Sequence, residues 1–326
     1  MKRAGQALAI CVVVLGGFWA TSTRAHQAPD AKAALAKDDS CITCHAGTGH
    51  VADIYQSRHG NKADPRTPGC VNCHGASDKH MTDPPGIAPD VVFAATSKRR
   101  SPATARSASC LSCHASHVLP RTLWAGSQHE TRGVSCTDCH NIHAADQKVM
   151  NKATQAEVCV TCHRAQRAEI RHLSGHPLAK TGIGSPPTMA CSACHDPHGS
   201  NGPTLLRKNT VNETCYTCHA EKRGPFLWEH APVVESCVTC HTPHGSPLPS
   251  LLKARPPYMC QECHTGDHAA QINSGANLAG GNVTTVNGKQ QVAAASPRAQ
   301  LAARACLNCH VLIHGSNHPA GAKFQR

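Results

Sequence analysis

The stretch CVTCHTPHGS at 237–246 has a near copy, CSACHDPHGS, at 191–200. Each begins with a cysteine, two spacer residues, a second cysteine and a histidine. This pentapeptide, C-x-x-C-H, occurs ten times between residues 41 and 310 and uses 20 of the 21 cysteines. Such regular recurrence indicates one kind of site that is built ten times along the chain.

The motif C-x-x-C-H is the attachment site of c-type haem, in which two thiols form thioethers with the haem and the adjacent histidine binds the iron. The predicted thioether residues are Cys41, Cys44, Cys70, Cys73, Cys110, Cys113, Cys136, Cys139, Cys159, Cys162, Cys191, Cys194, Cys215, Cys218, Cys237, Cys240, Cys260, Cys263, Cys306 and Cys309. The predicted proximal iron ligands are His45, His74, His114, His140, His163, His195, His219, His241, His264 and His310. Zinc ribbons and disulfide frameworks also pair cysteines, but neither explains a histidine after every second cysteine. The sequence therefore predicts ten covalently bound c-type haems.

Histidines outside the motifs are numerous enough to supply a second ligand to every iron. The chain divides into five two-haem units, 41–109, 110–158, 159–214, 215–259 and 260–326, and each unit carries at least one histidine between its two motifs and at least one after the second. The predicted distal ligands are His59, His80, His129, His143, His176, His198, His230, His244, His268 and His314. His80 and His268 fit the register least well, with His50 and His318 as substitutes. A histidine three residues after a proximal one is expected to serve a neighbouring haem.

Two imidazole ligands on each iron would leave no position for a substrate, so the predicted chemistry is outer-sphere electron transfer. The methionines are expected to be packing residues, and no catalytic residue is assigned.

Aromatic residues make up only 3% of the chain, which leaves little material for an ordinary core. The expected fold is therefore a multihaem cytochrome c, with short α-helices and irregular loops wrapped around a linear array of ten haems and with little β structure. Helices are expected over 154–173 and around Cys306. Residues 82–109 and 269–300 break the haem density and are expected to be surface loops, with partner docking as the alternative.

Residues 1–25 have a basic start, an apolar core and a small-residue cleavage site, which predicts a secretory signal peptide and a mature domain of 26–326. The formal charge of +12 would favour a nucleic-acid partner. Loss of Lys2, Arg3 and Arg24 lowers this charge to +9. Ten haems would then add about twenty propionate charges and about ten ferric charges, which gives a net charge of roughly −1. No nucleic-acid partner is expected.

The stretch CYTCHAEKRGPFLWEHAPVVESCVTCHTPHGS at 215–246 and the closing CLNCHVLIHGSNHP at 306–319 carry a family likeness. The chain resembles the periplasmic decahaem cytochromes of outer-membrane electron conduits, the Mtr, Mto, Pio and Dms types. The resemblance covers essentially all of 26–326. It implies ten bis-histidine haems and a periplasmic chain that sits inside an outer-membrane, porin-like β-barrel. Implied partners are periplasmic or inner-membrane cytochromes on one side and an extracellular multihaem cytochrome, iron or another metal on the other.

Three functions remain open from the sequence. The first is a conduit across the outer membrane for extracellular metal reduction or iron(II) oxidation. The second is a soluble periplasmic electron shuttle, and the third is a multihaem oxyanion reductase. A reductase usually keeps one haem with an open or lysine-ligated site, and no C-x-x-C-K variant occurs here. The direction of electron flow is not encoded in the motifs.

Overall fold

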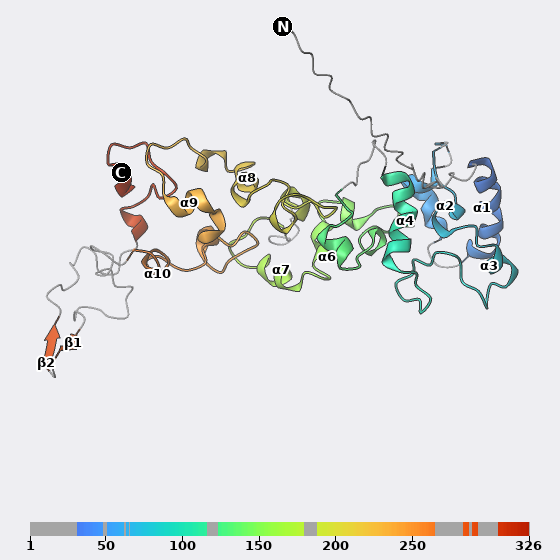
Figure 1. The fold of residues 1–326 in the computed structure, drawn as a ribbon, viewed down its shortest axis with the longest axis horizontal. Coiled ribbons are helices and arrows are strands. Elements are labelled where there is room, and N and C mark those ends of the chain that lie inside the picture. The colour runs from blue at the N-terminus through green and yellow to red at the C-terminus, as the bar shows by residue number, and fades with distance from the viewer. Residues whose placement is uncertain are drawn as a thin grey trace, which may run out of the picture.

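Short helices follow one another along a single long axis in the computed structural model (Figure 1). The structure describes residues 31–47, 51–61, 63–64, 66–115, 123–178, 188–264, 283–286, 289–292 and 306–325. The helices α1, α2 and α3 lie at one end of this axis, and α9, α10 and the last residues lie at the other (Figure 1). Position in the sequence therefore corresponds to position along the molecule.

The helices are short. The α-helices are α1 (Ala31–His45), α2 (Cys70–His74), α3 (Asp78–Thr82), α4 (Ala103–His114), α5 (Gln128–Thr131), α6 (Gln155–Cys159), α7 (Arg164–Glu169), α8 (Val211–Tyr216), α9 (Ala231–Glu235) and α10 (Tyr258–Gln261). The 3-10 turns are η1 (Ala52–Gln56), η2 (Arg58–Gly60), η3 (Cys136–Asp138), η4 (Lys148–Met150), η5 (Cys191–Ala193), η6 (Pro203–Leu205), η7 (Ala220–Lys222), η8 (Cys237–Thr239), η9 (Pro249–Leu251), η11 (Cys306–Asn308) and η12 (Gly321–Lys323). Among the described residues, none of the helices has the length and apolar character that a bilayer crossing requires.

The C-x-x-C-H motif itself ends several of these helices. The continuous helix predicted over 154–173 is wrong, because α6 ends at Cys159 and α7 begins only at Arg164. Between them the amide of His163 bonds to the carbonyl of Cys159, and the backbone of His163 leaves the helical region at φ −83°, ψ 70°. The helix expected around Cys306 is the 3-10 turn η11. The motif is thus compatible with both conformations, since α1, α2 and α4 each contain a complete C-x-x-C-H motif in α-helical form.

The structure describes part of each of the two stretches between motifs. Within 269–300 the structure describes an antiparallel hairpin, β1 (Val283–Val286) and β2 (Lys289–Val292), with Val283 opposite Val292. Within 82–109, turns lead into α4, where Arg106 and Ser107 are buried. The expectation of little β structure is confirmed for the described residues, in which this hairpin is the only sheet.

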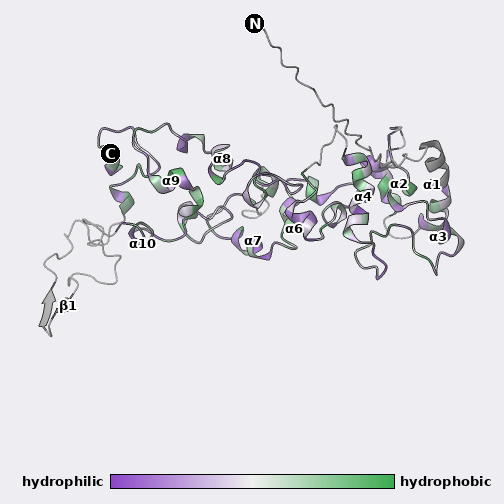
Figure 2. Cartoon of the chain, in the orientation of Figure 1, coloured by the Kyte–Doolittle hydropathy of each residue, from purple (hydrophilic) through white to green (hydrophobic). Residues whose placement is uncertain are grey.

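The protein atoms alone form almost no apolar core. The buried apolar side chains of the described residues are Trp124, Ala156, Leu178, Ala190 and Leu206, two of which are alanines. Polar and apolar residues mix along the whole array, with no apolar band gathered inside it (Figure 2). A chain of this size with so few buried apolar side chains is not stabilised by its own side chains alone, and it requires another group in its interior.

Candidate functional site: a file of paired histidines

Among the described residues, histidine rings lie opposite each other in nine pairs along the array. The two ring centres of a pair are 6.0–6.4 Å apart. The pairs are His45–His80, His59–His114, His74–His143, His129–His163, His140–His198, His176–His219, His195–His244, His230–His264 and His241–His314. Each pair joins one motif histidine to one of the histidines that the sequence assigned as distal.

The pairs join consecutive two-haem units. A histidine between two motifs lies opposite the first motif of the next unit, as His129 does with His163. A histidine that follows a second motif lies opposite the second motif of the preceding unit, as His244 does with His195. His80 differs, because its partner His45 belongs to its own unit. Most pairs therefore need two units to be complete, in line with the expectation that trailing histidines serve a neighbouring site.

Many of these histidine rings donate a hydrogen bond from Nδ1 to a main-chain carbonyl. Because a carbonyl oxygen can only accept, Nδ1–H is the donor in each bond and Nε2 carries the lone pair that a metal needs. These bonds are 2.6–3.1 Å long and run from His74 to Val91, His80 to Ile87, His129 to Pro197, His143 to Val51, His176 to Pro243, His195 to Thr204, His230 to Ile313, His241 to Ser250 and His310 to Lys323.

The spacing of the pairs fits an iron ion held between two imidazoles. Two metal–nitrogen bonds of about 2 Å, with roughly 1.1 Å from each ring centre to its nitrogen, give about 6 Å between ring centres. The separation stays nearly constant while the angle between the ring planes varies from 14° to 75°, so a group shared between the rings explains it better than direct packing of one ring on the other. The residues present therefore fit haem iron, which the two imidazoles of each pair would hold.

Burial favours the neutral form of several paired rings. It lowers the pKa values of His59, His74, His195, His230 and His314. Neutral imidazole is the form that binds a metal, so the environment prepares these rings for ligation. His59 differs in one respect, because its buried Nδ1 has no hydrogen-bond partner among the described residues.

The histidines outside the nine pairs differ from the paired ones in how their ring nitrogens are bonded or in whether the structure describes them. Nδ1 of His318 accepts the amide of Ala320 at 3.1 Å, so Nε2 carries the hydrogen and has no lone pair for a metal. Neither His318 nor His172 is a member of the nine pairs. His268, the histidine assigned to the fifth unit, lies outside the described residues, as do His26, His50 and His117.

Cysteines of successive motifs lie near one another. The neighbouring residues are the first cysteines within a unit and the second cysteines between units. Within a unit the first cysteines of the two motifs make side-chain contact, as for Cys110 with Cys136, Cys159 with Cys191, Cys215 with Cys237 and Cys260 with Cys306. Between units the second cysteines are near enough to interact electrostatically, as for Cys73 with Cys113, Cys139 with Cys162, Cys194 with Cys218 and Cys240 with Cys263. Successive motifs are therefore successive neighbours in space.

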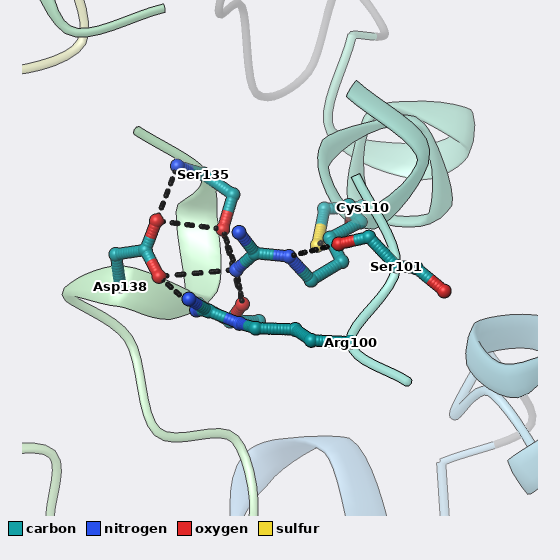
Figure 3. A network of polar contacts seen from close by, with 7 residues as sticks. Arg100, Ser101, Cys110, Ser135 and Asp138 are labelled. Carbon is teal, nitrogen blue, oxygen red and sulfur yellow. Dashed lines mark hydrogen bonds and ion pairs between the residues drawn. The ribbon is translucent and has the colours of Figure 1, made fainter. Parts of the chain in front are cut away.

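A polar side chain holds the two motifs of a unit together. In four units this residue stands three or four positions before the first motif and reaches the start of the second. Asp38 accepts the amide of Cys70, Gln155 that of Ser192 and Asn212 that of Cys237. Arg106 performs this role in the unit 110–158, where it bonds to Ser135, Thr137 and Asp138 (Figure 3). Sequence reasoning missed these residues, because their contacts span 25 to 37 positions.

Close backbone contacts lock each unit to the next. Ser174 and Ser246 exchange two backbone hydrogen bonds of 2.8 and 3.1 Å. Beside them, Gly245 has φ +155°, and a Cβ there would collide with the carbonyl oxygen of Glu169. Gly199 has φ +121° and lies in the same way against the carbonyl of Leu123. The glycine of the repeated H-G-S triplet is therefore required by a junction between units.

Replacement of Gly245 by Ala is expected to lower stability by about 1–3 kcal/mol, because the backbone conformation and the close carbonyl both oppose a side chain. The measurement is the denaturant midpoint of the haem-loaded protein. Gly175→Ala is the matched control in the same junction, where an added Cβ meets neighbours only at 3.7 Å or more. Equal midpoints for the two variants would contradict the proposed role of Gly245.

Comparison with known proteins agrees with the repeated haem motif. A family model described as cytochrome c-type protein NrfB-like matches residues 70–162. A second model, described as doubled CXXCH motif, matches residues 185–224 and 230–269. These matches cover the middle of the array and indicate covalently bound c-type haem.

A curated relative extends the likeness over most of the chain. This protein is the multiheme cytochrome MtrA of Shewanella baltica, which is 42% identical over 293 residues. The aligned part is 88% of this chain and 81% of the relative. Identity at that level over that length shows common family membership, and with the haem motifs it indicates an electron carrier. The chain belongs to the MtrA family of multihaem cytochromes, electron-transfer proteins with covalently bound c-type haem.

Proposed function

We propose that residues 26–326 bind ten c-type haems, each through the two cysteines and the histidine of one motif and through one distal histidine. The nine pairs at 6.0–6.4 Å are the observation that carries this proposal. We propose His268, which lies outside the described residues, as the distal ligand of the haem held by His310. Bound haem supplies a centre that accepts and releases one electron with little change of geometry. The chain itself orients many of the rings through Nδ1 and would provide two imidazoles to each iron.

The haems are proposed to stand in sequence order along the molecule. The alternating contacts between first cysteines and second cysteines support this order, since each motif has the preceding and the following motif as its neighbours. The extended arrangement of the helices supports it as well (Figure 1). An electron would thus travel from one end of the chain to the other without passing over a distant gap.

We propose that this file crosses the outer membrane inside a porin-like β-barrel. Irregular backbone in contact with lipid would leave polar groups unpaired at several kcal/mol each, so a loop-rich chain requires a protein sheath. A file of ten haems is longer than the about 40–45 Å of a bilayer with its headgroups. Electrons would enter from periplasmic or inner-membrane cytochromes, or leave toward them, and exchange outside with a multihaem cytochrome or with iron or another metal.

The signal peptide over 1–25 supports export, so the chain is placed in the periplasm and held at the outer membrane by the barrel. It is proposed to act as an electron carrier and not as an enzyme, because two strong ligands on every iron leave no site for a substrate.

Two measurements on the purified holoprotein test the coordination. Mass spectrometry is expected to give a chain that starts near residue 26 with ten haems, and electron paramagnetic resonance is expected to show low-spin ferric iron only. Fewer haems, or a high-spin ferric signal that binds cyanide, would overturn the proposal and favour a reductase.

Sealed liposomes with an enclosed redox dye test the conduit. Electron transfer from an external reductant is expected only when the cytochrome and its co-purified barrel are both in the membrane. If the cytochrome never co-purifies with a barrel protein, the soluble shuttle replaces the conduit.

A further inference from the structure

One paired histidine has a carboxylate partner in place of a carbonyl. Oε2 of Glu169, the last residue of α7, lies 3.1 Å from Nδ1 of His244. The two residues are 75 positions apart in the sequence. Two other carboxylates lie near ring nitrogens in the described region, Asp196 at 3.5 Å from His198 and Glu221 at 3.8 Å from His219. Of these three pairs, that of Glu169 is the one within ordinary hydrogen-bond distance.

The contact between Glu169 and His244 is fixed by the surrounding backbone. Ser174 and Ser246 bond to each other on the C-terminal side of both residues, and the Oγ of Ser174 also accepts the amide of Leu251 at 3.0 Å. Gly245 packs directly on the main chain of Glu169. The carboxylate therefore meets the ring as part of the junction between two units and not through a freely rotating surface chain.

A charged acceptor changes the electronic character of an axial imidazole. Eight of the paired rings in the described region donate Nδ1–H to a neutral main-chain carbonyl, and His140 donates to the side-chain amide of Gln147 at 2.9 Å. A carboxylate draws the proton more strongly, which places more negative charge on the ring and makes Nε2 a stronger donor. A stronger donor stabilises ferric iron over ferrous iron, so it lowers the reduction potential.

We propose that Glu169 tunes the haem held between His195 and His244 to a lower reduction potential than a neutral acceptor would give. This inference rests on the proposed bis-histidine ligation of that haem. Glu169 acts through His244 and is therefore a positioning residue. One electron enters the iron on reduction and leaves it on oxidation, while the bonds of Glu169 and His244 stay the same. The site lies near the middle of the array, where α7 is found (Figure 1).

Spectroelectrochemical titration of Glu169→Gln at constant pH tests the proposal. The amide keeps an acceptor of the same shape but removes the charge. One tenth of the haem absorbance is expected to titrate at a higher potential. The reduction equilibrium of that haem should favour the ferrous form by about tenfold, or about 59 mV for one electron. Tenfold is the upper end, because the Glu169 side chain is 39% exposed and water screens its charge.

Gln147→Glu is the reciprocal variant. It would place a carboxylate on His140, and one tenth of the absorbance is expected to move to lower potential. Glu157→Gln is the charge control, since it removes a carboxylate from the neighbouring helix α6, where the structure gives that side chain no imidazole partner, and it is expected to leave the titration close to that of the wild type.

The outcomes distinguish a failure of the proposed role of Glu169 from a failure of the proposed bis-histidine coordination. If both variants hold ten low-spin haems and neither titration shifts, the role of Glu169 is refuted and the coordination stands. If the reduction potential shifts equally in Glu157→Gln, the contact between Glu169 and His244 is not the cause. The shift would then come from the loss of any nearby negative charge. If the wild type itself lacks a low-spin haem at this site, the proposed coordination fails first.

Discussion

Replacement of His314 by Ala is expected to convert one haem in ten from low-spin to high-spin. His314 lies 6.1 Å from His241, centre to centre, in the most nearly parallel of the pairs, with 14° between the ring planes. Alanine supplies no ligand, so the iron held by His241 would keep a single axial imidazole. Electron paramagnetic resonance of the ferric protein is expected to show a high-spin signal equal to about one tenth of the iron, and added imidazole should restore the low-spin form.

His318→Ala is the matched control, four residues further along the same segment. Its Nδ1 accepts a backbone amide, so its Nε2 cannot bind a metal in the neutral form. The variant is expected to keep all haems low-spin. A high-spin signal in His318→Ala, or none in His314→Ala, would mean that the two histidines have been assigned the wrong way round.

Replacement of Arg106 by Leu is expected to destabilise the haem-loaded protein by about 2 kcal/mol. The Arg106 side chain is 4% exposed and bonds to Asp138 at 3.0 Å, to Ser135 and to Thr137, while Arg100 also pairs with Asp138 (Figure 3). Loss of one partner from a buried pair costs about 3–5 kcal/mol. The smaller figure applies here because the Asp138 side chain is 26% exposed and keeps Arg100 as a partner. The measurement is the denaturant midpoint.

Arg66→Leu is the control for a loss of charge at the surface. Arg66 pairs with Asp64 at 2.8 Å, but its side chain is 88% exposed, so its removal is expected to leave the denaturant midpoint close to that of the wild type. Similar midpoints for the Arg106 and Arg66 variants would show that the buried network does not hold the two motifs of its unit together.

Short-range sequence patterns were sufficient to identify the C-x-x-C-H motifs, but they predicted the helix boundaries wrongly. The period of residues 154–173 favours one helix, yet α6 ends at Cys159 and α7 begins only at Arg164. Residues 269–300 are expected to form a surface loop, yet the dipeptide Asn287-Gly288 between β1 and β2 is typical of a two-residue hairpin turn. The hairpin signal is therefore local, whereas the helical period does not record where one helix ends and the next begins.

The sequence by itself determined what is local: the ten C-x-x-C-H motifs, the need for haem as a core and a supply of second histidines in register. These follow because thioether spacing and proximal ligation lie within five consecutive residues. Only the tertiary structure decided which histidines face each other, why His318 differs from His314, and that Glu169 reaches His244 across 75 positions. Those relations join separate units, and the distance between two side chains from different units is set by how the units pack and not by their order along the chain.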